Sequence, residues 1–187
     1  MSEGIITRRI KTPNPFLLDN FGGAAAAYSL RLLSANEFGN PVVKVRRDSD
    51  NAEQDFTASE INDGSLVAWV GNTASDNGFV TTWYDQSGNG NDATQSTAAS
   101  QPKIVSGGSL VTENSKPAID FDGSNDYVEI SNGQNFLPSS DITISYWQYV
   151  NTEKDSGAVF WAPIDNTNRL GLHTPWSDGN WYWDFGS

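Results

Sequence analysis

Hydrophobic and polar residues alternate with a period of two over much of the chain, a pattern that predicts β-strands. Runs rich in β-branched and aromatic residues are expected to form strands at residues 42–47 and 79–84. Residues 118–121 and 127–130 flank the turn sequence DGSND, so we expect them to pair as a hairpin.

The C-terminal part of the chain carries the clearest alternation. Residues 142–149 present two well-defined faces and are expected to form one strand. An Asp-Gly turn then separates two further strands, with Leu170, Leu172 and Thr174 on one face before the turn and Trp181, Trp183 and Phe185 on one face after it. The last strand would be a very apolar edge, so we expect further strands or another chain to cover it.

Two segments have helical character instead. The sequence AAAAYSLRLLS, which begins at Ala24, combines strong helix formers with apolar spacings of three and four, and stop signals follow at Asn36, Gly39 and Pro41. We therefore expect one amphipathic helix there. A single-turn helix is expected at residues 65–70, with Asp63 as its cap.

Short strands, 17 glycines and a single long helix favour an all-β fold, an antiparallel two-sheet sandwich with one helix near the N-terminus. A length of 187 residues suits one such domain. We expect an extended N-terminal arm over residues 1–20 and a sandwich over residues 21–187, whose C-terminal end could be truncated.

Charge divides the chain unevenly. Residues 1–47 hold seven basic and three acidic residues, a net charge of +4, whereas the remainder holds four basic and twenty acidic residues, a net charge of −16. Because residues 48–187 are so acidic, nucleic acid and anionic membranes are disfavoured as partners. The absence of cysteine excludes thiol catalysis and cysteine-bound zinc.

The N-terminal arm has the charges of a signal peptide without its apolar core, so no secretion signal is predicted. Two interpretations of the arm are open: it is a disordered leader, or it is an anchor that contacts a partner in a larger assembly. Pro13 and Pro15 keep the segment extended. The anchoring residues would be Ile5, Ile6, Arg8, Arg9, Ile10, Phe16, Leu17 and Leu18.

The stretch TTWYDQSGNGNDATQ at residues 81–95 offers the main chemical candidates. It lacks the lysine of a phosphate-binding loop and the acid spacing of an EF-hand. Its glycines and asparagines tolerate a positive φ, which is typical of a turn. We expect Asp85 to cap backbone N–H groups of the turn at Ser87–Asn91 rather than to act in catalysis.

This stretch, together with VKVRRDSDNAEQDF at residues 43–56, resembles the paired signature of the α-L-arabinofuranosidase B catalytic domain. With QPKIV, KPAIDFDGSNDYVEI and DITISYWQYV, it also resembles laminin-G/concanavalin-like domains of phage virion and bacterial surface proteins. Both resemblances imply a jelly-roll sandwich. The acids of the arabinofuranosidase lie outside the matched block, and no catalytic residue is assigned here.

Three other groups of residues are candidates for binding. Laminin-G-like domains often bind Ca²⁺, and oxygen donors for it could converge from Asp120, Asp122, Asn125 and Asp126, although a turn with solvated acids is the more common explanation of such a cluster. His173 has no partner nearby in sequence and is expected to be an ordinary strand residue. Tryptophans could form a sugar-stacking platform, but most of them are expected to fill the core; the residues expected at an exposed glycan site are Trp176, Asp178 and Asn180.

We therefore expect a structural or adhesive virion protein, anchored through its N-terminal arm to other subunits, forming a homo-oligomer and able to bind a host surface glycan. The resemblance to virion proteins and the lack of a signal peptide indicate assembly in the host cytoplasm. The alternatives are an arabinofuranosidase-like glycoside hydrolase and a stand-alone lectin.

Overall fold

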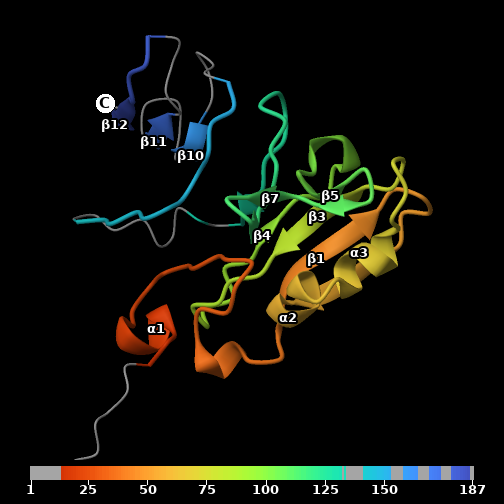
Figure 1. The fold of residues 1–187 in the computed structure, drawn as a ribbon. Coiled ribbons are helices and arrows are strands. Elements are labelled where there is room, and N and C mark those ends of the chain that lie inside the picture. The colour runs from red at the N-terminus through yellow and green to blue at the C-terminus, as the bar shows by residue number, and fades with distance from the viewer. Residues whose placement is uncertain are drawn as a thin grey trace, which may run out of the picture.

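The computed structural model describes residues 14–131, 133, 141–152, 158–163, 169–173 and 178–185. Every strand pair in this part of the chain is antiparallel, and the helices are few and short, which confirms the expected all-β fold. The sheets are β2-β1-β3-β4-β9, with β5 beside β3 and β6 beside β5; β10-β11-β12; and β7-β8 (Figure 1).

The strands of the largest sheet are β1 (Pro41–Arg47), β2 (Glu53–Thr57), β3 (Gly78–Trp83), β4 (Ala93–Thr94), β5 (Lys103–Ser106), β6 (Ser109–Leu110) and β9 (Glu129–Ile130). The smaller sheets comprise β7 (Thr112–Glu113), β8 (Lys116–Pro117), β10 (Ala158–Pro163), β11 (Arg169–His173) and β12 (Trp183–Phe185). The helices are α1 (Leu17–Asn20), α2 (Ala58–Asn62), α3 (Ser65–Val70) and the 3₁₀ turns η1 (Ala35–Glu37) and η2 (Ala98–Ser100). The expected strands at 42–47 and 79–84 are thus confirmed as β1 and β3.

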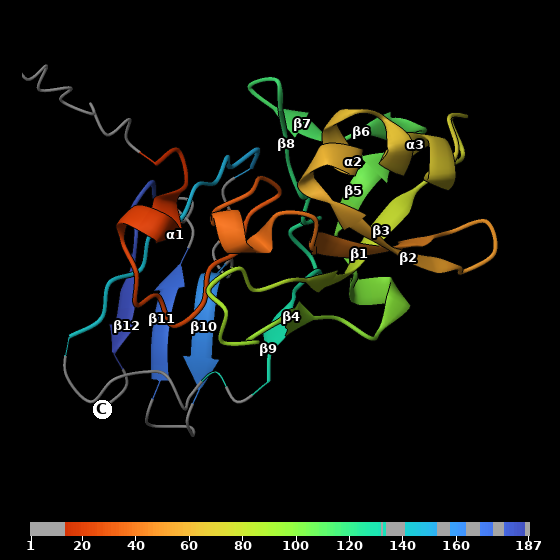
Figure 2. The same ribbon diagram turned by 90° about the horizontal axis from the view of Figure 1, so that it is seen from below.

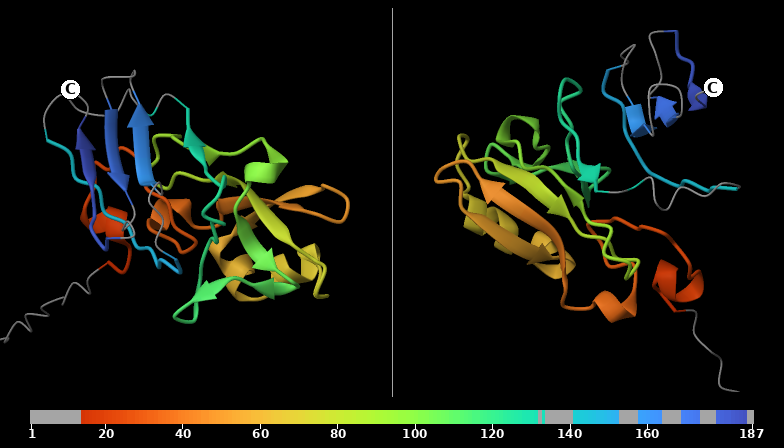
Figure 3. Two further views of the ribbon diagram at one scale, coloured as in Figure 1. Left: turned by 90° about the horizontal axis from the view of Figure 1, so that it is seen from above. Right: turned by 180° about the vertical axis from the view of Figure 1, so that it is seen from behind.

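One face of the large sheet is apolar. A row in register crosses five strands and consists of Phe56, Val43, Trp83, Ala93 and Ile130. Helices α2 and α3 pack against this face, as Figure 1 and the view from behind in Figure 3 both show. Their buried residues Ile61, Leu66 and Val70 join the strand residues in one core. The core therefore lies between the sheet and a helical layer.

Helix α2 is an element that the strand and helix patterns did not predict, although its sequence signal is present. Thr57 accepts a hydrogen bond from the Glu60 backbone N–H at 3.3 Å, and Glu60 accepts one from the Thr57 backbone N–H at 2.8 Å. This capping box satisfies two N–H groups that the first turn leaves free. Helix α3 matches the predicted single-turn helix, but its N-cap residue is Gly64 and not the expected Asp63, whose carboxylate accepts from the N–H of Ser65, the first residue of the helix.

The expected hairpin of residues 118–121 and 127–130 is wrong. Asp120 exchanges two backbone hydrogen bonds with Lys103, and β9 pairs with β4. The Asp122 carboxylate closes the intervening turn by accepting from the N–H groups of Ser124 and Asn125. The chain consequently crosses to another strand instead of folding back on itself.

Residues 141–150 do not form the expected strand. They run as an irregular segment, and no described strand pairs with them. Alternating polarity produces a strand only where a neighbour supplies hydrogen bonds, and this segment finds none in the described part of the chain. The two strands around the Asp-Gly turn are confirmed as β11 and β12, which pair in register from Leu170↔Phe185 to Leu172↔Trp183.

The expected helix at residues 24–35 is also wrong. Residues 21–34 follow an irregular path, and only η1 beyond them is helical. Polar side chains of the loop at residues 85–91 take up the backbone groups that a helix would have paired internally. The arm is not wholly extended either, because α1 begins at Leu17, two residues after Pro15, and a proline restricts only its own φ and the residue before it.

Candidate functional site

The signature loop at residues 85–91 is a binding site for the chain's own segment 24–33. We call this segment the strap. The Asp85 carboxylate accepts from the Ala27 N–H at 2.8 Å, and the Gln86 N–H donates to the Ala27 carbonyl, also at 2.8 Å. Almost sixty positions separate these residues in the sequence, so the loop holds the N-terminal region onto the sheet domain.

Gln86 fixes the C-terminal half of the strap. Its side-chain oxygen accepts from the Leu33 N–H at 2.8 Å, and its Nε2 donates to the Ser29 and Arg31 carbonyls at 2.9 and 3.0 Å. The residue is only 2% exposed, and all three side-chain bonds go to main-chain atoms. An amide that is both donor and acceptor suits this task, because a backbone offers both kinds of group.

Asparagines of the loop hold the other end of the strap. Asn89 donates to the Ala24 and Ala25 carbonyls at 2.9 and 3.1 Å, and Asn91 Nδ2 donates to the Ala25 carbonyl at 2.8 Å. The Tyr28 hydroxyl donates to the Asn91 carbonyl, and burial raises the pKa of Tyr28, with a further contribution from the charges of nearby carboxylates. The Tyr28 ring lies 5.7 Å from the ring of Trp83 between centroids.

Asp85 has the capping role that the sequence predicts. Besides Ala27, it accepts from the N–H groups of Ser87 and Asn91 at 2.8 and 3.0 Å and from the Ser87 hydroxyl at 2.7 Å. The residue is 8% exposed. Since each carboxylate oxygen accepts two hydrogen bonds from the protein, Asp85 is a structural acid at the centre of the loop.

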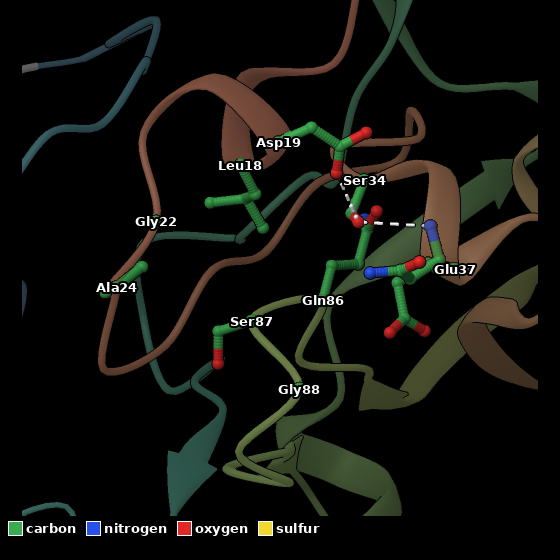
Figure 4. A pocket seen from close by; sticks show the side chains of 11 residues that line it. Leu18, Asp19, Gly22, Ala24, Ser34, Glu37, Gln86, Ser87 and Gly88 are labelled. Carbon is green, nitrogen blue, oxygen red and sulfur yellow. Dashed lines mark hydrogen bonds between the residues drawn. The ribbon is translucent and has the colours of Figure 1, made fainter.

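A cavity of about 330 Å³ lies where the strap, α1 and the signature loop meet. Figure 4 shows side chains from these three segments and from η1 around it, including Asp19 of α1, Ala24 of the strap, Glu37 of η1, and Gln86 and Ser87 of the loop. Two carboxylates therefore line one cavity beside the block that resembles the arabinofuranosidase signature.

The two carboxylates of this cavity already have protein partners. Asp19 accepts from the Ser34 hydroxyl at 2.7 Å and from the Ala35 N–H, and the Ser34 hydroxyl holds the pKa of Asp19 below its ordinary value. Glu37 accepts from the Asn40 amide at 2.9 Å. Asp19 is thus ionised at neutral pH and unable to donate a proton to a leaving group.

A second candidate site is an aromatic surface at the C-terminal end of the described chain. It consists of the exposed side chains Tyr146, Trp147, Tyr149, Trp181, Tyr182 and Trp183. Tyr146 and Trp181 have ring centroids 6.4 Å apart. Segment 141–150 runs past β12 in two views (Figure 2; Figure 3, left). Core filling, which we expected for most of the tryptophans, is wrong for Trp147, Trp181 and Trp183.

The predicted glycan residues lie partly at this surface. The Asp178 carboxylate accepts from the Asn180 N–H at 2.9 Å, from the Asn180 amide at 3.0 Å and from the Tyr182 hydroxyl at 2.6 Å. The Tyr182 hydroxyl bond is the main cause of a lowered Asp178 pKa. Trp176 lies outside the described residues. Asp178 and Asn180 therefore form a closed turn that orients Tyr182 within the aromatic surface.

The acids proposed for Ca²⁺ lie in the turn after β8. Asp122 accepts backbone N–H groups, and Asp126 accepts from the Asp122 N–H at 3.0 Å. Asn125 donates to the Ala99 carbonyl at 2.6 Å, and Asp120 faces Lys103. Among the residues that the structure describes, no group of three His, Cys, Asp or Glu side chains is arranged to hold a metal ion. The Ca²⁺ site stays a prediction, and an unchanged melting temperature in millimolar Ca²⁺ would remove it.

The anchoring residues of the arm are only partly described. Ile5, Ile6, Arg8, Arg9 and Ile10 lie outside the described residues. Leu17 is half exposed on α1, and Leu18 donates its N–H to the Leu33 carbonyl at 3.0 Å and lines the cavity. Phe16 directly precedes the helix. The end of the arm thus contacts the strap.

Comparisons with protein-family models, curated proteins and solved structures find no match. Within the described part of the chain, no helix combines the length and the apolar character that crossing a membrane requires.

Sequence reasoning missed Gln86, whose side chain makes three bonds to the strap. No local pattern marks a glutamine whose partners lie more than fifty positions away. Sequence reasoning also missed a cluster on the large sheet in which two basic residues, Arg46 and Lys103, lie over the ring of Phe79. Register between strands brings these three together, and the sequence alone does not specify which strand pairs with β5.

Proposed function

We propose that the protein is a structural and adhesive module of the concanavalin-like jelly-roll type, carried on a phage virion or bacterial surface, with the aromatic surface as its contact for a glycan. The antiparallel all-β fold supports the jelly-roll assignment, and the sequence resemblance supports the virion context. The arm provides the attachment to other subunits, including further copies of this chain.

The aromatic surface is the observation that carries this proposal. Trp147 is fully exposed, and Trp183 and Tyr149 are more than half exposed. Exposing such large apolar side chains to water is costly, and a grouped set of them marks a binding surface. Indole and phenol faces pack well against the C–H faces of sugar rings, and the Asp178 turn supplies acceptors for sugar hydroxyls.

A glycan array with single-residue variants tests this role. We expect binding to at least one glycan, and we expect Trp181→Ala to weaken it by more than about tenfold, which corresponds to about 1.4 kcal/mol. Phe38→Ala is the matched control, because Phe38 is also an exposed aromatic residue but follows η1. Binding that Trp181→Ala leaves intact, or no binding to any glycan, would contradict the proposal.

Attachment to a particle is tested separately by sedimentation. Protein that lacks residues 1–20 is expected to remain folded but to lose assembly with particles from which the protein is missing. The truncation also removes the Asp19 contacts to Ser34 and Ala35. Asp19→Asn in the full chain therefore serves as a control for local loosening, and unchanged incorporation of the truncated protein would identify the arm as a leader.

An arabinofuranosidase is the second candidate, and the cavity with Asp19 and Glu37 is what favours it. A glycosidase needs two acids about 5–9 Å apart, one of them protonated. The lowered pKa of Asp19 leaves Glu37 as the proton donor in such a scheme. Turnover of an aryl arabinofuranoside that Glu37→Gln abolishes would replace the adhesive proposal by this one.

A further inference from the structure

The face of the large sheet opposite α2 and α3 carries a row of charged residues around one aromatic ring. Backbone register places five residues in line across neighbouring strands: Glu53, Arg46, Phe79, Lys103 and Asp120. Residues that are register partners point to the same face of a sheet, so these side chains lie next to one another. The row reads acid, base, ring, base, acid.

Both bases lean over the ring in the middle of the row. The Arg46 guanidinium carbon lies 4.7 Å from the centroid of Phe79, and the Lys103 ammonium nitrogen lies 6.0 Å from it. The ion pairs of the described residues are Lys44–Asp55 and Arg47–Asp50. Neither Arg46 nor Lys103 therefore forms a salt bridge with a described acid, and two positive charges converge on one ring in a protein of net charge −12.

Arg46 is held in this position by neutral amides. Its Nε donates to Gln101 Oε1 at 2.7 Å, and its Nη1 donates to Asn51 Oδ1 at 2.9 Å. Gln101 is buried and anchored in turn by donating to the Gln95 carbonyl at 2.9 Å. The guanidinium is thus oriented before any ligand arrives, while its Nη2 has no acceptor in the described part of the chain. Such preorganisation lowers the entropic cost of binding.

We propose that Arg46 and Lys103 bind a carboxylate group above Phe79, and that the ligand is a hexuronate sugar. The two bases supply the charge for the carboxylate, and guanidinium–carboxylate bonds are among the strongest that proteins form. Phe79 offers an apolar contact to the C–H groups of the sugar ring. Glu53 and Asp120 accept hydrogen bonds from its hydroxyls and, because they are anions, reject a ligand with further negative charges along the row.

The test compares glucuronate with glucose, which differ in the carboxylate. Titration of ¹⁵N-labelled protein is followed by the amide signals of β1, β3 and β5. We expect glucuronate to shift these signals in a saturable manner and glucose to leave them unchanged. Acetate is expected to bind at least about tenfold more weakly than glucuronate, since it lacks the ring and hydroxyls.

Lys103→Gln is the decisive variant, because Arg46→Gln also removes the bonds to Gln101 and Asn51 and can loosen the sheet. Lys103→Gln is expected to weaken glucuronate binding at least about tenfold. Lys116→Gln, at an exposed lysine on β8, is the control and is expected to bind as the wild type does. No saturable shift, equal shifts with glucose, equal binding of acetate, or full binding by Lys103→Gln would each overturn the proposal.

Discussion

Replacing Asp85 by Asn tests whether the signature loop is a structural cradle for the strap. Each carboxylate oxygen accepts two hydrogen bonds: Oδ1 from the N–H groups of Ala27 and Ser87, and Oδ2 from the Ser87 hydroxyl and the Asn91 N–H. Asparagine keeps the shape but offers one acceptor oxygen and an NH₂ group in place of the other. At least one backbone N–H must therefore lose its partner whichever way the amide points.

The least costly orientation of the new side-chain amide determines how much stability the protein loses. With the NH₂ group towards Ser87 Oγ, the hydroxyl can turn and accept, and only the Asn91 N–H is left facing a donor. A hydrogen bond to a charged group contributes about 1.5–3 kcal/mol, and an unpaired buried donor costs about 1–3 kcal/mol. We expect Asp85→Asn to lower the free energy of unfolding by about 2–4 kcal/mol, which corresponds to about 4–16 °C in melting temperature for a chain of this length.

Urea unfolding followed by tryptophan fluorescence measures the loss of stability, and hydrogen exchange locates it. The Asn91 amide, which loses its acceptor, should exchange faster in Asp85→Asn than in the wild type, whereas the Leu33 amide should not, because Leu33 donates to Gln86 instead. Asp92→Asn is the matched control: Asp92 accepts one bond, from the Asp85 N–H, and an amide oxygen can accept it equally well. A variant Asp85→Asn within about 0.5 kcal/mol of the wild type, with unchanged exchange of the Asn91 amide, would refute the structural role.

Three further predictions concern single residues. Thr57→Ala removes the capping box of α2 and should destabilise the protein by about 1 kcal/mol in urea unfolding, whereas Thr57→Ser should not. Tyr28→Phe keeps the packing on Trp83 but loses the hydroxyl bond, so it should cost about 1 kcal/mol; equal stability would show that bond to be unimportant. Burial is the main cause of a raised Asp126 pKa, and neighbouring acids add to it, so the ionised form of Asp126 destabilises the fold. Asp126→Asn should therefore be more stable than the wild type at pH 7 and lose that advantage as the pH falls below about 4, where Asp126 is protonated in both folded and unfolded chains.

Several elements could be predicted because their causes are local. The strands β1 and β3 and the pair β11–β12 follow from β-rich runs and an Asp-Gly turn. Helix α3 and the capping role of Asp85 follow from residues within a few positions of each other. The capping box of α2 was equally readable, since Thr57 and Glu60 stand three positions apart next to an apolar residue.

The errors lie where a distant partner competes with local preference. Residues 24–33 have strong helix propensity, but propensity amounts to tenths of a kcal/mol per residue. Side chains of Asp85, Gln86 and Asn89 offer the strap backbone a set of hydrogen bonds that exceeds this preference. Residues 142–149 illustrate the converse, since their alternation is strong but no described strand pairs with them.

The sequence by itself determined the all-β class, the acidic character, the absence of thiol chemistry and the turn-forming nature of the signature loop, because composition and short-range spacing suffice for these. Only the tertiary structure decided that the loop binds the strap, that the aromatic residues at positions 146, 147, 149 and 181–183 are exposed, and that Arg46 and Lys103 meet over Phe79. Each of these depends on strand register or on contacts between residues tens of positions apart. A hydrogen-bond donor in the sequence does not specify its acceptor; the fold does so by bringing the two within reach.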